Sequence, residues 1–350
     1  EDMEEEVVML LSKVNASGEW ASQETVSAIS VDEDALTQFV DSLEEGEFAR
    51  ASMSGRLPLA FPDRRTHCNF LCFMHTLLAA QQSVADKDEW DSLVEATAGK
   101  DLTETIQFGM LGMFLSDQPL DAAGMEKFGW NQLQEFFALS PMTEEELQPG
   151  IYQGVPSSVK ALGDRLVAEI NVAGFRLQSL HHQDFFDLFQ TSQSMDQLLD
   201  DLSQVVGESF HLPTEDPAAT AVTVTLGLRE HRMVSAVARL TEVQLPEPGM
   251  PSFVAGSSTL PALLCRAGVM KLLDESLQEA LQQEDLSMVS VPLRQGLQLL
   301  AVCNAVATRM VPMLQDKHSD ATSLFPHVLD DRGSKCATIV LQDALPQRLR

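Results

Sequence analysis

Basic residues are scarce in this sequence. Its 350 residues include 23 lysines and arginines against 52 aspartates and glutamates, which gives a formal net charge of −29. A surface this negative repels phosphate backbones and anionic lipid, so we expect no direct binding of DNA or RNA. A small phosphorylated ligand in a locally basic pocket is compatible with this charge. So is a protein partner with a basic surface, and so is a role in solubility alone.

A disulfide framework is absent as well. The five cysteines are an odd number, and the spacing of Cys68, Cys72, Cys265, Cys303 and Cys336 matches no paired pattern. All except Cys336 lie in apolar, helical sequence contexts. We therefore expect buried free thiols in a reducing compartment.

Membrane and export signals are the third absence. No stretch approaches the roughly 20 apolar residues that span a bilayer, so we expect no membrane insertion. No signal-peptide pattern opens the chain, which begins at Glu1 rather than Met. We interpret it as a fragment or a processed product. We expect it to be soluble in the cytoplasm, or in an organelle after removal of a targeting segment.

Common catalytic fingerprints are also missing. There is no G-x-S-x-G elbow, no P-loop and no Rossmann glycine pattern. Two polar clusters remain. The run Arg229–Arg232 in "GLREHRM" could hold an anion or form a solvated helix start. Asp184 and Asp187 in "HHQDFFDLF" could be paired carboxylates, or simply the polar face of an amphipathic helix.

Helical periodicity is what the sequence does contain. Hydrophobic residues make up 44% of the chain, enough for a large core. Apolar residues recur at helical spacing. They predict helices near 3–14, 32–43, 65–85, 101–116, 124–139, 157–175, 182–190, 195–206, 229–243, 260–270, 274–284 and 292–316. We therefore predict one mainly α-helical domain over residues 1–350 with little sheet, in which 245–259 is an internal boundary or a site loop.

Local signals refine this prediction. Ser30 or Asp32 suits the N-cap of the helix near 32–43, and Gly174 suits a C-cap. "MTEEEL" has the charge pattern of a helix start. "ATAVTVTLG" at 219–227 predicts a strand, and "CATIVL" predicts a strand or an arm within an otherwise irregular last 30 residues.

The stretch "THCNFLCFMHTLL" raises the question of a metal site. Cys68, Cys72 and His75 are spaced i, i+4 and i+7, so they share one face of a helix. Structural zinc sites usually take four ligands from two separated pairs. The nearest other candidates, His181 and His182, are adjacent and point in different directions on a helix. We therefore predict a buried core helix with no metal and no cofactor.

Several segments, taken in order, resemble one family, the queuosine salvage proteins. "VSAISVDEDALTQFVDSL" is similar to the family's opening helix, with the pattern V-x-I-x-x-x-x-L. "FPDRRTHCNFLCFMHTLL" resembles its T-V-N-F-I-F-V-L-D-T-L-N-F helix, and "SSVKALGDRLVAEINVAG" its P-L-L-E-E-R-x-x-x-L-x-E-x-G helix. The most similar stretch is "STLPALLCRAGVMKLLDESLQEALQ", which resembles the family's R-L-P-Q-V-L-x-x-L-G-A-L-x-Y-S-x-x-L. The next segment, "VPLRQGLQLLAVCNAV", resembles the helix that follows in the family. The matching residues are Asn69, Phe70, Thr76, Leu77, Arg165, Gly174, Leu260, Pro261, Leu264, Gly268 and Leu277.

The resemblance implies a largely helical fold similar to that of DNA glycosylases. It implies a hydrolase in the salvage of a tRNA modification. The family hydrolyses the N-glycosidic bond of queuosine 5′-phosphate and releases queuine, without a metal. The ligand would be a small nucleotide or nucleoside.

The resemblance also assigns site residues. His75 stands at the Asp of the family's D-T-L-N-F run, and Ser257 at the Asp of its A-D-Y-R segment, so these two are the catalytic positions. The candidates for substrate binding are Asn69, Thr259, Arg229, His231 and Arg232. Thr259 stands at the Arg of A-D-Y-R. Arg229, His231 and Arg232 lie in a segment that matches the family's F-Y-K-R-A-Q loosely.

Two functions follow, because both family acids are replaced. The first is a diverged N-glycosylase, and the second is a non-catalytic binding or structural module. Serine and neutral histidine cannot substitute for an ionised carboxylate that faces a sugar cation. We expect weak or absent hydrolysis, and we expect His75 and Ser257–Thr259 to line one cavity.

Overall fold

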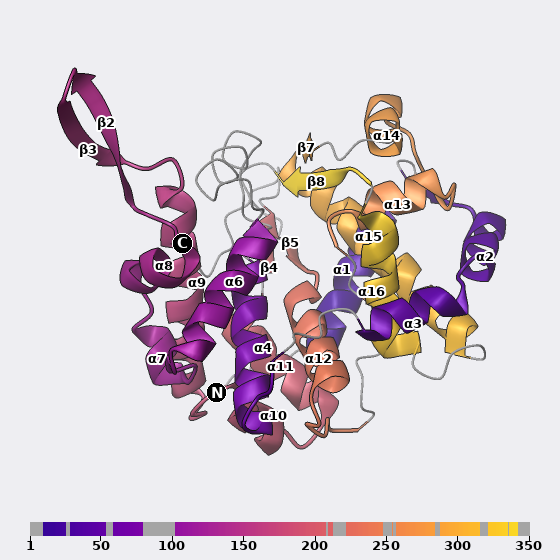
Figure 1. The fold of residues 1–350 in the computed structure, drawn as a ribbon. Helices are drawn as coiled ribbons and strands as arrows, with labels where there is room; N and C mark the ends of the chain where they lie inside the picture. Colours follow the sequence, from indigo (N-terminus) through magenta and orange to yellow (C-terminus); the bar gives the residue numbers. More distant parts are fainter. Residues whose placement is uncertain are drawn as a thin grey trace, which may run out of the picture. The chain divides into compact units, whose positions relative to one another are not determined.

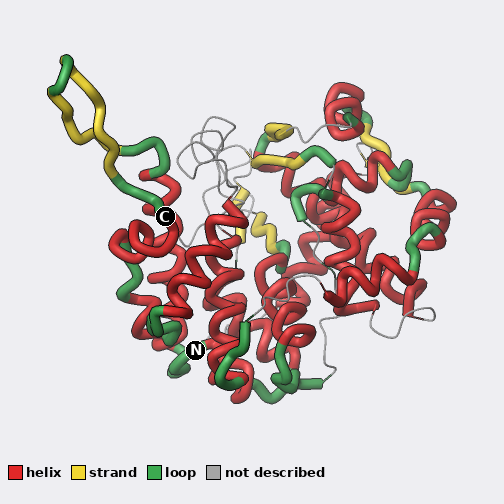
Figure 2. Tube along the Cα trace, in the orientation of Figure 1, coloured by secondary structure: helices red, strands yellow, loops and turns green. Residues whose placement is uncertain are grey.

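The computed structural model describes residues 10–25, 29–53, 59–79, 102–207, 209–212, 222–247, 254, 257–283, 288–315, 321–334 and 336–341. Within these ranges the chain forms fifteen helices and eight short strands, and the strands make four separate two-stranded sheets (Figures 1 and 2). The prediction of a mainly α-helical fold with little sheet is confirmed.

The elements have the following bounds. The helices are α1 (Leu10–Thr25), α2 (Glu33–Asp41), α3 (Glu45–Met53), α4 (Arg64–Ala79), α6 (Leu102–Leu115), α7 (Ala122–Glu126), α8 (Trp130–Phe137), α9 (Lys160–Ser179), α10 (Phe185–Thr191), α11 (Met195–Val206), α12 (Leu228–Leu240), α13 (Leu260–Arg266), α14 (Glu275–Gln282), α15 (Leu293–Gln315) and α16 (Ala321–Gly333). The strands are β1 (Ile29–Val31), β2 (Met142–Gln148), β3 (Ile151–Pro156), β4 (Ser209–Leu212), β5 (Val222–Thr225), β6 (Met270–Leu272), β7 (Met288–Val291) and β8 (Thr338–Leu341). All pairs are antiparallel except β7–β8.

The described residues divide into two compact units. The first combines the chain up to Ala60 with the chain from Ser192 onward, and the second is Phe61–Thr191. Both boundaries lie outside 245–259. The single-domain prediction over residues 1–350 stays a prediction.

Helix α15 is the centre of the first unit and packs against α1, α13, α16 and β8. Its buried side chains run from Leu297 to Leu314. Among the described helices, α15 is also the one that is long and apolar enough to cross a bilayer, with a mean hydropathy of 1.4. The expectation that the sequence contains no such stretch is therefore wrong. Of this apolar window, 61% is buried inside the protein. A core helix of a soluble protein has this same composition.

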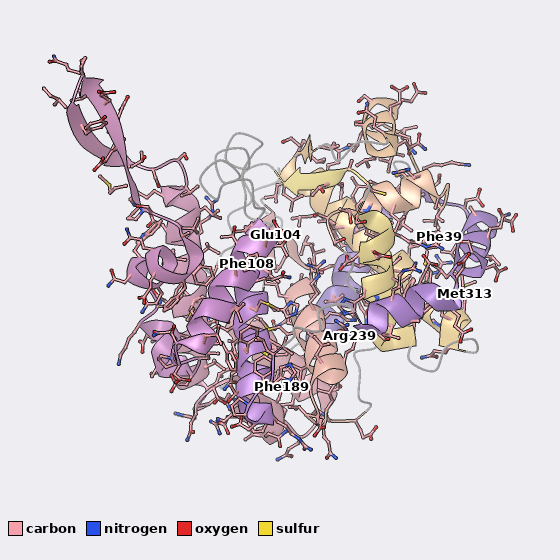
Figure 3. All side chains as sticks on the ribbon, viewed as in Figure 1. Phe39, Glu104, Phe108, Phe189, Arg239 and Met313 are labelled. Carbon is pink, nitrogen blue, oxygen red and sulfur yellow. The ribbon has the colours of Figure 1, made fainter. Side chains whose placement is uncertain are left out.

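Helix α4 is the centre of the second unit and packs against α6, α9 and α10. Phe70, Leu71 and Phe73 are almost fully buried, as is Phe189 of α10, which Figure 3 labels. The prediction that "THCNFLCFMHTLL" forms a buried core helix is confirmed. All five cysteines are free and buried, as expected.

Some local predictions are resolved by side-chain contacts. Asp32 is the N-cap of α2, because its carboxylate accepts the amide of Ala35, whereas Ser30 lies in β1. Gly174 is not a C-cap. Helix α9 continues to Ser179, and a Cβ at Gly174 would lie 2.7 Å from the carbonyl oxygen of Ala122. This glycine permits the close approach of α7 and α9.

Two other predictions are wrong. "MTEEEL" begins strand β2, not a helix. The Pro149–Gly150 turn closes a hairpin, with Gly150 at φ 78° and its amide bonded to Glu146 Oε1. The expectation that the last 30 residues are irregular apart from "CATIVL" is also wrong, because Ala321–Gly333 forms helix α16. The predicted strands at 219–227 and "CATIVL" are confirmed within β5 and β8.

Candidate functional site

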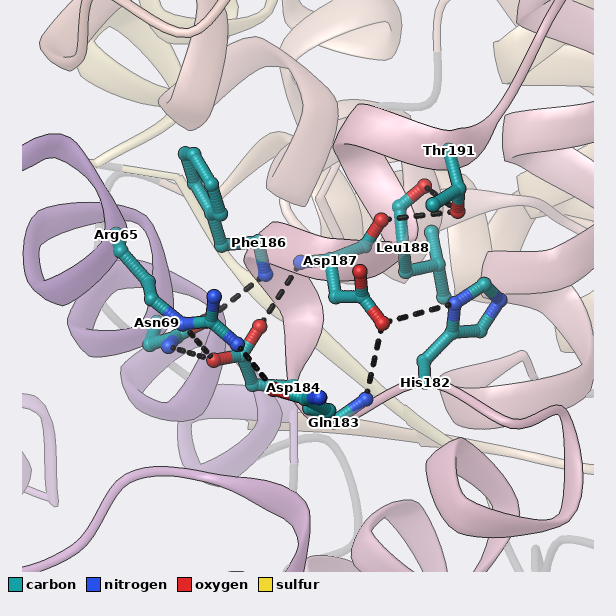
Figure 4. Close-up of polar contacts among 9 residues, drawn as sticks. All are labelled: Arg65, Asn69, His182, Gln183, Asp184, Phe186, Asp187, Leu188 and Thr191. Carbon is teal, nitrogen blue, oxygen red and sulfur yellow. Dashed lines mark hydrogen bonds and ion pairs between the residues drawn. The ribbon is translucent and has the colours of Figure 1, made fainter.

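Asp184, just before α10, is the centre of a polar network in the second unit (Figure 4). Its Oδ1 accepts the amide of Asp187 at 2.8 Å, which caps the start of α10. Its Oδ2 accepts Arg65 Nε at 2.6 Å and Asn69 Nδ2 at 2.9 Å. Since the Asp184 side chain is only 3% exposed, these three donors satisfy a buried carboxylate.

Asn69 and Arg65 connect α4 to this start of α10. Asn69 Oδ1 accepts the amide of Phe186 at 2.9 Å. Arg65 Nη2 donates to Gln183 Oε1 at 3.2 Å, and its guanidinium lies 5.7 Å from the ring centroid of Phe186. Arg65 is therefore held in one orientation by a carboxylate, an amide and an aromatic ring.

Asp187 has a different role from Asp184. Its Oδ2 accepts the amide of Gln183 at 3.1 Å and lies 3.7 Å from His182 Nδ1. Both carboxylates therefore accept backbone N–H groups around the same turn. This arrangement stabilises the start of α10 and supports the amphipathic-helix interpretation of the two aspartates.

A cavity of about 750 Å³ borders this network within the second unit. Its lining includes Arg65, Asn69, Asp184, Phe114 and Asp117. The volume falls in the range of small-molecule sites. Carboxylates, amides and one guanidinium beside an aromatic ring suit a polar ligand rich in hydrogen-bond donors.

The start of α12 in the first unit is buried, so a solvated helix start is the wrong interpretation of this cluster. Arg229, Glu230 and His231 are 3%, 1% and 0% exposed. The chain enters α12 directly from β5 through Gly227, which has φ 65° and lies in the left-handed region. The strand–helix connection carries these three side chains into the unit.

Arg232 lies one position further and contacts α16. Its Nη2 lies 3.1 Å from Asp330 Oδ2, and both side chains are about one-third exposed. One turn further along α12, Ser235 Oγ lies 3.3 Å from His327 Nε2. Burial, and then the positive charges of Arg239 and Arg232, lower the pKa of His327 to about 3. His327 is therefore a neutral, hydrogen-bonding side chain at neutral pH.

Thr259, with Ser257 bonded to it, contacts the same last turn of α16. Their hydroxyl oxygens lie 2.7 Å apart, and both residues are half-buried. Thr259 packs on Gly333, where an added Cβ would lie 2.6 Å from Thr259 Oγ1. The last turn of α16 thus contacts Arg232 through Asp330 and Thr259 through Gly333.

The structure therefore brings part of the predicted site together. Arg232 and Thr259 contact the last turn of α16 in the first unit, and Ser257 is bonded to Thr259, whereas Asn69 and His75 belong to α4 in the second. The prediction that His75 and Ser257 share a cavity joins residues of different units. It stays a prediction.

The two cysteines of α4 have the properties of core residues. Cys68 and Cys72 are both 0% exposed. Burial, followed by a hydrogen bond with Cys68, raises the pKa of the Cys72 thiol well above its ordinary value. Zinc binds thiolates, so this environment opposes metal binding. Among the described residues no group of three His, Cys, Asp or Glu side chains could hold a metal ion.

The contact between α12 and α16 is the part of this arrangement that the sequence does not predict. Ser235, His327 and Asp330 carry no motif, and Pro326 inside "LFPHVLDDRG" argues against a helix. The apolar spacing of Leu324, Phe325, Val328 and Leu329 is the signal that could have revealed it.

No protein-family model and no curated protein sequence matches this chain.

Proposed function

We propose that this chain binds a nucleoside or nucleotide on a helical scaffold of the queuosine salvage type, with N-glycosidic hydrolysis of queuosine 5′-phosphate weak or lost. The observation that carries the proposal is the hydroxyl pair of Ser257 and Thr259, 2.7 Å apart. The resemblance puts the family's acid and its neighbouring arginine at these two positions.

The chemistry of the reaction explains why this pair matters. Breaking an N-glycosidic bond develops positive charge on the sugar, which a carboxylate stabilises while an acid or base handles the proton. Two hydroxyls that bond each other are uncharged at neutral pH. They can still donate and accept hydrogen bonds, so this position suits recognition of a sugar or base better than its hydrolysis.

The contacts of α16 support a binding role. Arg232, Ser235 and Thr259 each lie against this helix, through Asp330, His327 and Gly333 respectively. Positioned polar groups on rigid helices are what recognition of a small polar ligand requires.

A second candidate is hydrolysis that uses a different carboxylate. Asp184 favours it, because this buried acid contacts Asn69 and borders the cavity of about 750 Å³. Its oxygens already accept three hydrogen bonds from Arg65, Asn69 and Asp187. A catalytic role would require one of these donors to move when ligand binds.

The test separates binding from turnover. Purified chain is titrated with queuosine 5′-phosphate by calorimetry, and queuine release is followed by chromatography. Saturable binding with little or no release supports the proposal. Robust release that Asp184→Asn abolishes, while Ser257→Ala leaves it intact, supports the second candidate. Absence of both binding and release contradicts both.

A further inference from the structure

The hairpin of β2 and β3 is a surface that the proposed function does not use. It extends away from the helices of its own unit, and its side chains stand out on both faces (Figures 1 and 3). Every residue from Met142 to Gly154 is exposed. A two-stranded hairpin without a third strand or a helix to pack on is marginally stable in water. An added strand would stabilise it.

Exposed apolar side chains are a second feature that favours a partner on this hairpin. Met142, Leu147, Ile151 and Tyr152 are 47%, 57%, 55% and 60% exposed, and they make up half of the large exposed hydrophobic side chains in the described chain. Among the strands that the structure describes, β2 pairs with β3 alone, so its other backbone edge is unpaired there. Apolar side chains beside an unpaired strand edge are typical of a surface that a partner covers.

The charge of β2 specifies what kind of partner fits. Glu144, Glu145 and Glu146 are consecutive, and the hairpin from Met142 to Pro156 contains no lysine or arginine. Successive residues of a strand point to opposite faces, so Glu144 and Glu146 share one face and Glu145 lies on the other. The register sets Glu146 opposite Tyr152 and Glu144 opposite Gly154.

We propose that the edge of β2 binds a basic segment of another protein as a third strand. A run of three consecutive lysines or arginines would oppose all three glutamates, because its side chains alternate between the faces in the same way. An arginine beside Glu146 would also reach the ring of Tyr152, which lies on the same face. Nucleic acid, anionic lipid and a second copy of this hairpin all carry the wrong charge.

The experiment uses a labelled synthetic hexapeptide as the probe, with the sequence valine-lysine-arginine-lysine-valine-threonine. Binding to the full chain is measured by fluorescence anisotropy at low and at physiological ionic strength. We expect saturable binding that salt weakens, since these charges are exposed. The triple variant Glu144→Gln, Glu145→Gln, Glu146→Gln should weaken binding about tenfold or more.

A matched control separates a local effect from net charge. Glu45, Glu135 and Glu279 are also exposed, and their replacement by glutamine removes the same three charges elsewhere. This control variant should bind the peptide as the original chain does. An equal loss in both variants would contradict a site on β2.

A second probe tests strand addition itself. The same peptide with alternate backbone nitrogens methylated keeps its charges and side chains but cannot pair along one edge. We expect it to lose most of the affinity. Equal binding of the methylated peptide, or no binding of the unmodified one at low salt, would overturn the proposal. None of these outcomes depends on binding or hydrolysis of a nucleotide.

Discussion

Asp184 Oδ2 lies 2.6 Å from Arg65 Nε, although the two residues are 119 positions apart along the chain. The same carboxylate oxygen accepts Asn69, so one buried acid joins the first two turns of α4 to the start of α10. Asp184 also borders the cavity of the second unit. It is therefore both a structural residue and the carboxylate that the second candidate function would use for hydrolysis.

Loss of this acid should destabilise the chain. Asp184→Asn removes the charge of a carboxylate that is only 3% exposed and accepts a charge-assisted bond from Arg65, so we expect a loss of about 1.5–3 kcal/mol in the free energy of unfolding. Urea denaturation followed by circular dichroism measures it. The control is Asp164→Asn, whose exposed pair with Lys160 should contribute about 1 kcal/mol or less. Equal effects of the two variants would contradict the network.

Close packing of α7 and α9 gives a second prediction. A Cβ at Gly174 would lie 2.7 Å from the backbone nitrogen of Glu126 and from the carbonyl oxygen of Ala122, and backbone atoms cannot easily move aside. Gly174→Ala should therefore destabilise by about 1–3 kcal/mol, measured as a fall in Tm. Gly154→Ala in the hairpin meets only Met142 Cε at 3.6 Å and should change Tm little. A neutral Gly174→Ala would show that this helix contact is looser than described.

His327 gives a prediction about pH. Its pKa falls from 6.5 to about 3 on folding, so the unfolded chain binds more protons at this residue between those values. The contribution of neutral His327 to the free energy of unfolding is fully present above pH 6.5. It is lost as the pH falls toward 3, by at most about 1.4 kcal/mol per pH unit. Urea denaturation from pH 7 to about pH 4 should show a shallower pH dependence in His327→Gln than in the original chain. Identical slopes would contradict a His327 pKa that is lowered in the folded chain.

Much of the helical fold can be read from local sequence patterns. Asp32 is visible as an N-cap candidate, and the apolar periodicity of α11 and α15 is strong. The hairpin and α16 are harder to read in this way, although α16 does carry an apolar spacing. A run of three glutamates favours helix over strand, and Pro326 opposes helix, so in both segments tertiary contacts or turn chemistry override local preference.

The site is less predictable than the fold. Asn69 and Asp184 are each visible in the sequence as polar residues in apolar surroundings. Nothing local indicates that they contact each other across 115 positions. The meeting of Arg232 and Thr259 on α16 depends on a helix that local patterns obscure. Contacts between distant segments are set by packing, which periodicity alone does not encode.

Queuine release from queuosine 5′-phosphate tests the central claim most directly. It should be compared between the purified chain and the double variant His75→Asp, Ser257→Asp, which puts a carboxylate at the two positions that the proposed resemblance assigns to catalysis. We expect little or no release by the original chain and a clear gain in the variant, since a positioned acid or base contributes roughly 10²–10⁴-fold in rate. Robust release by the original chain would contradict the account.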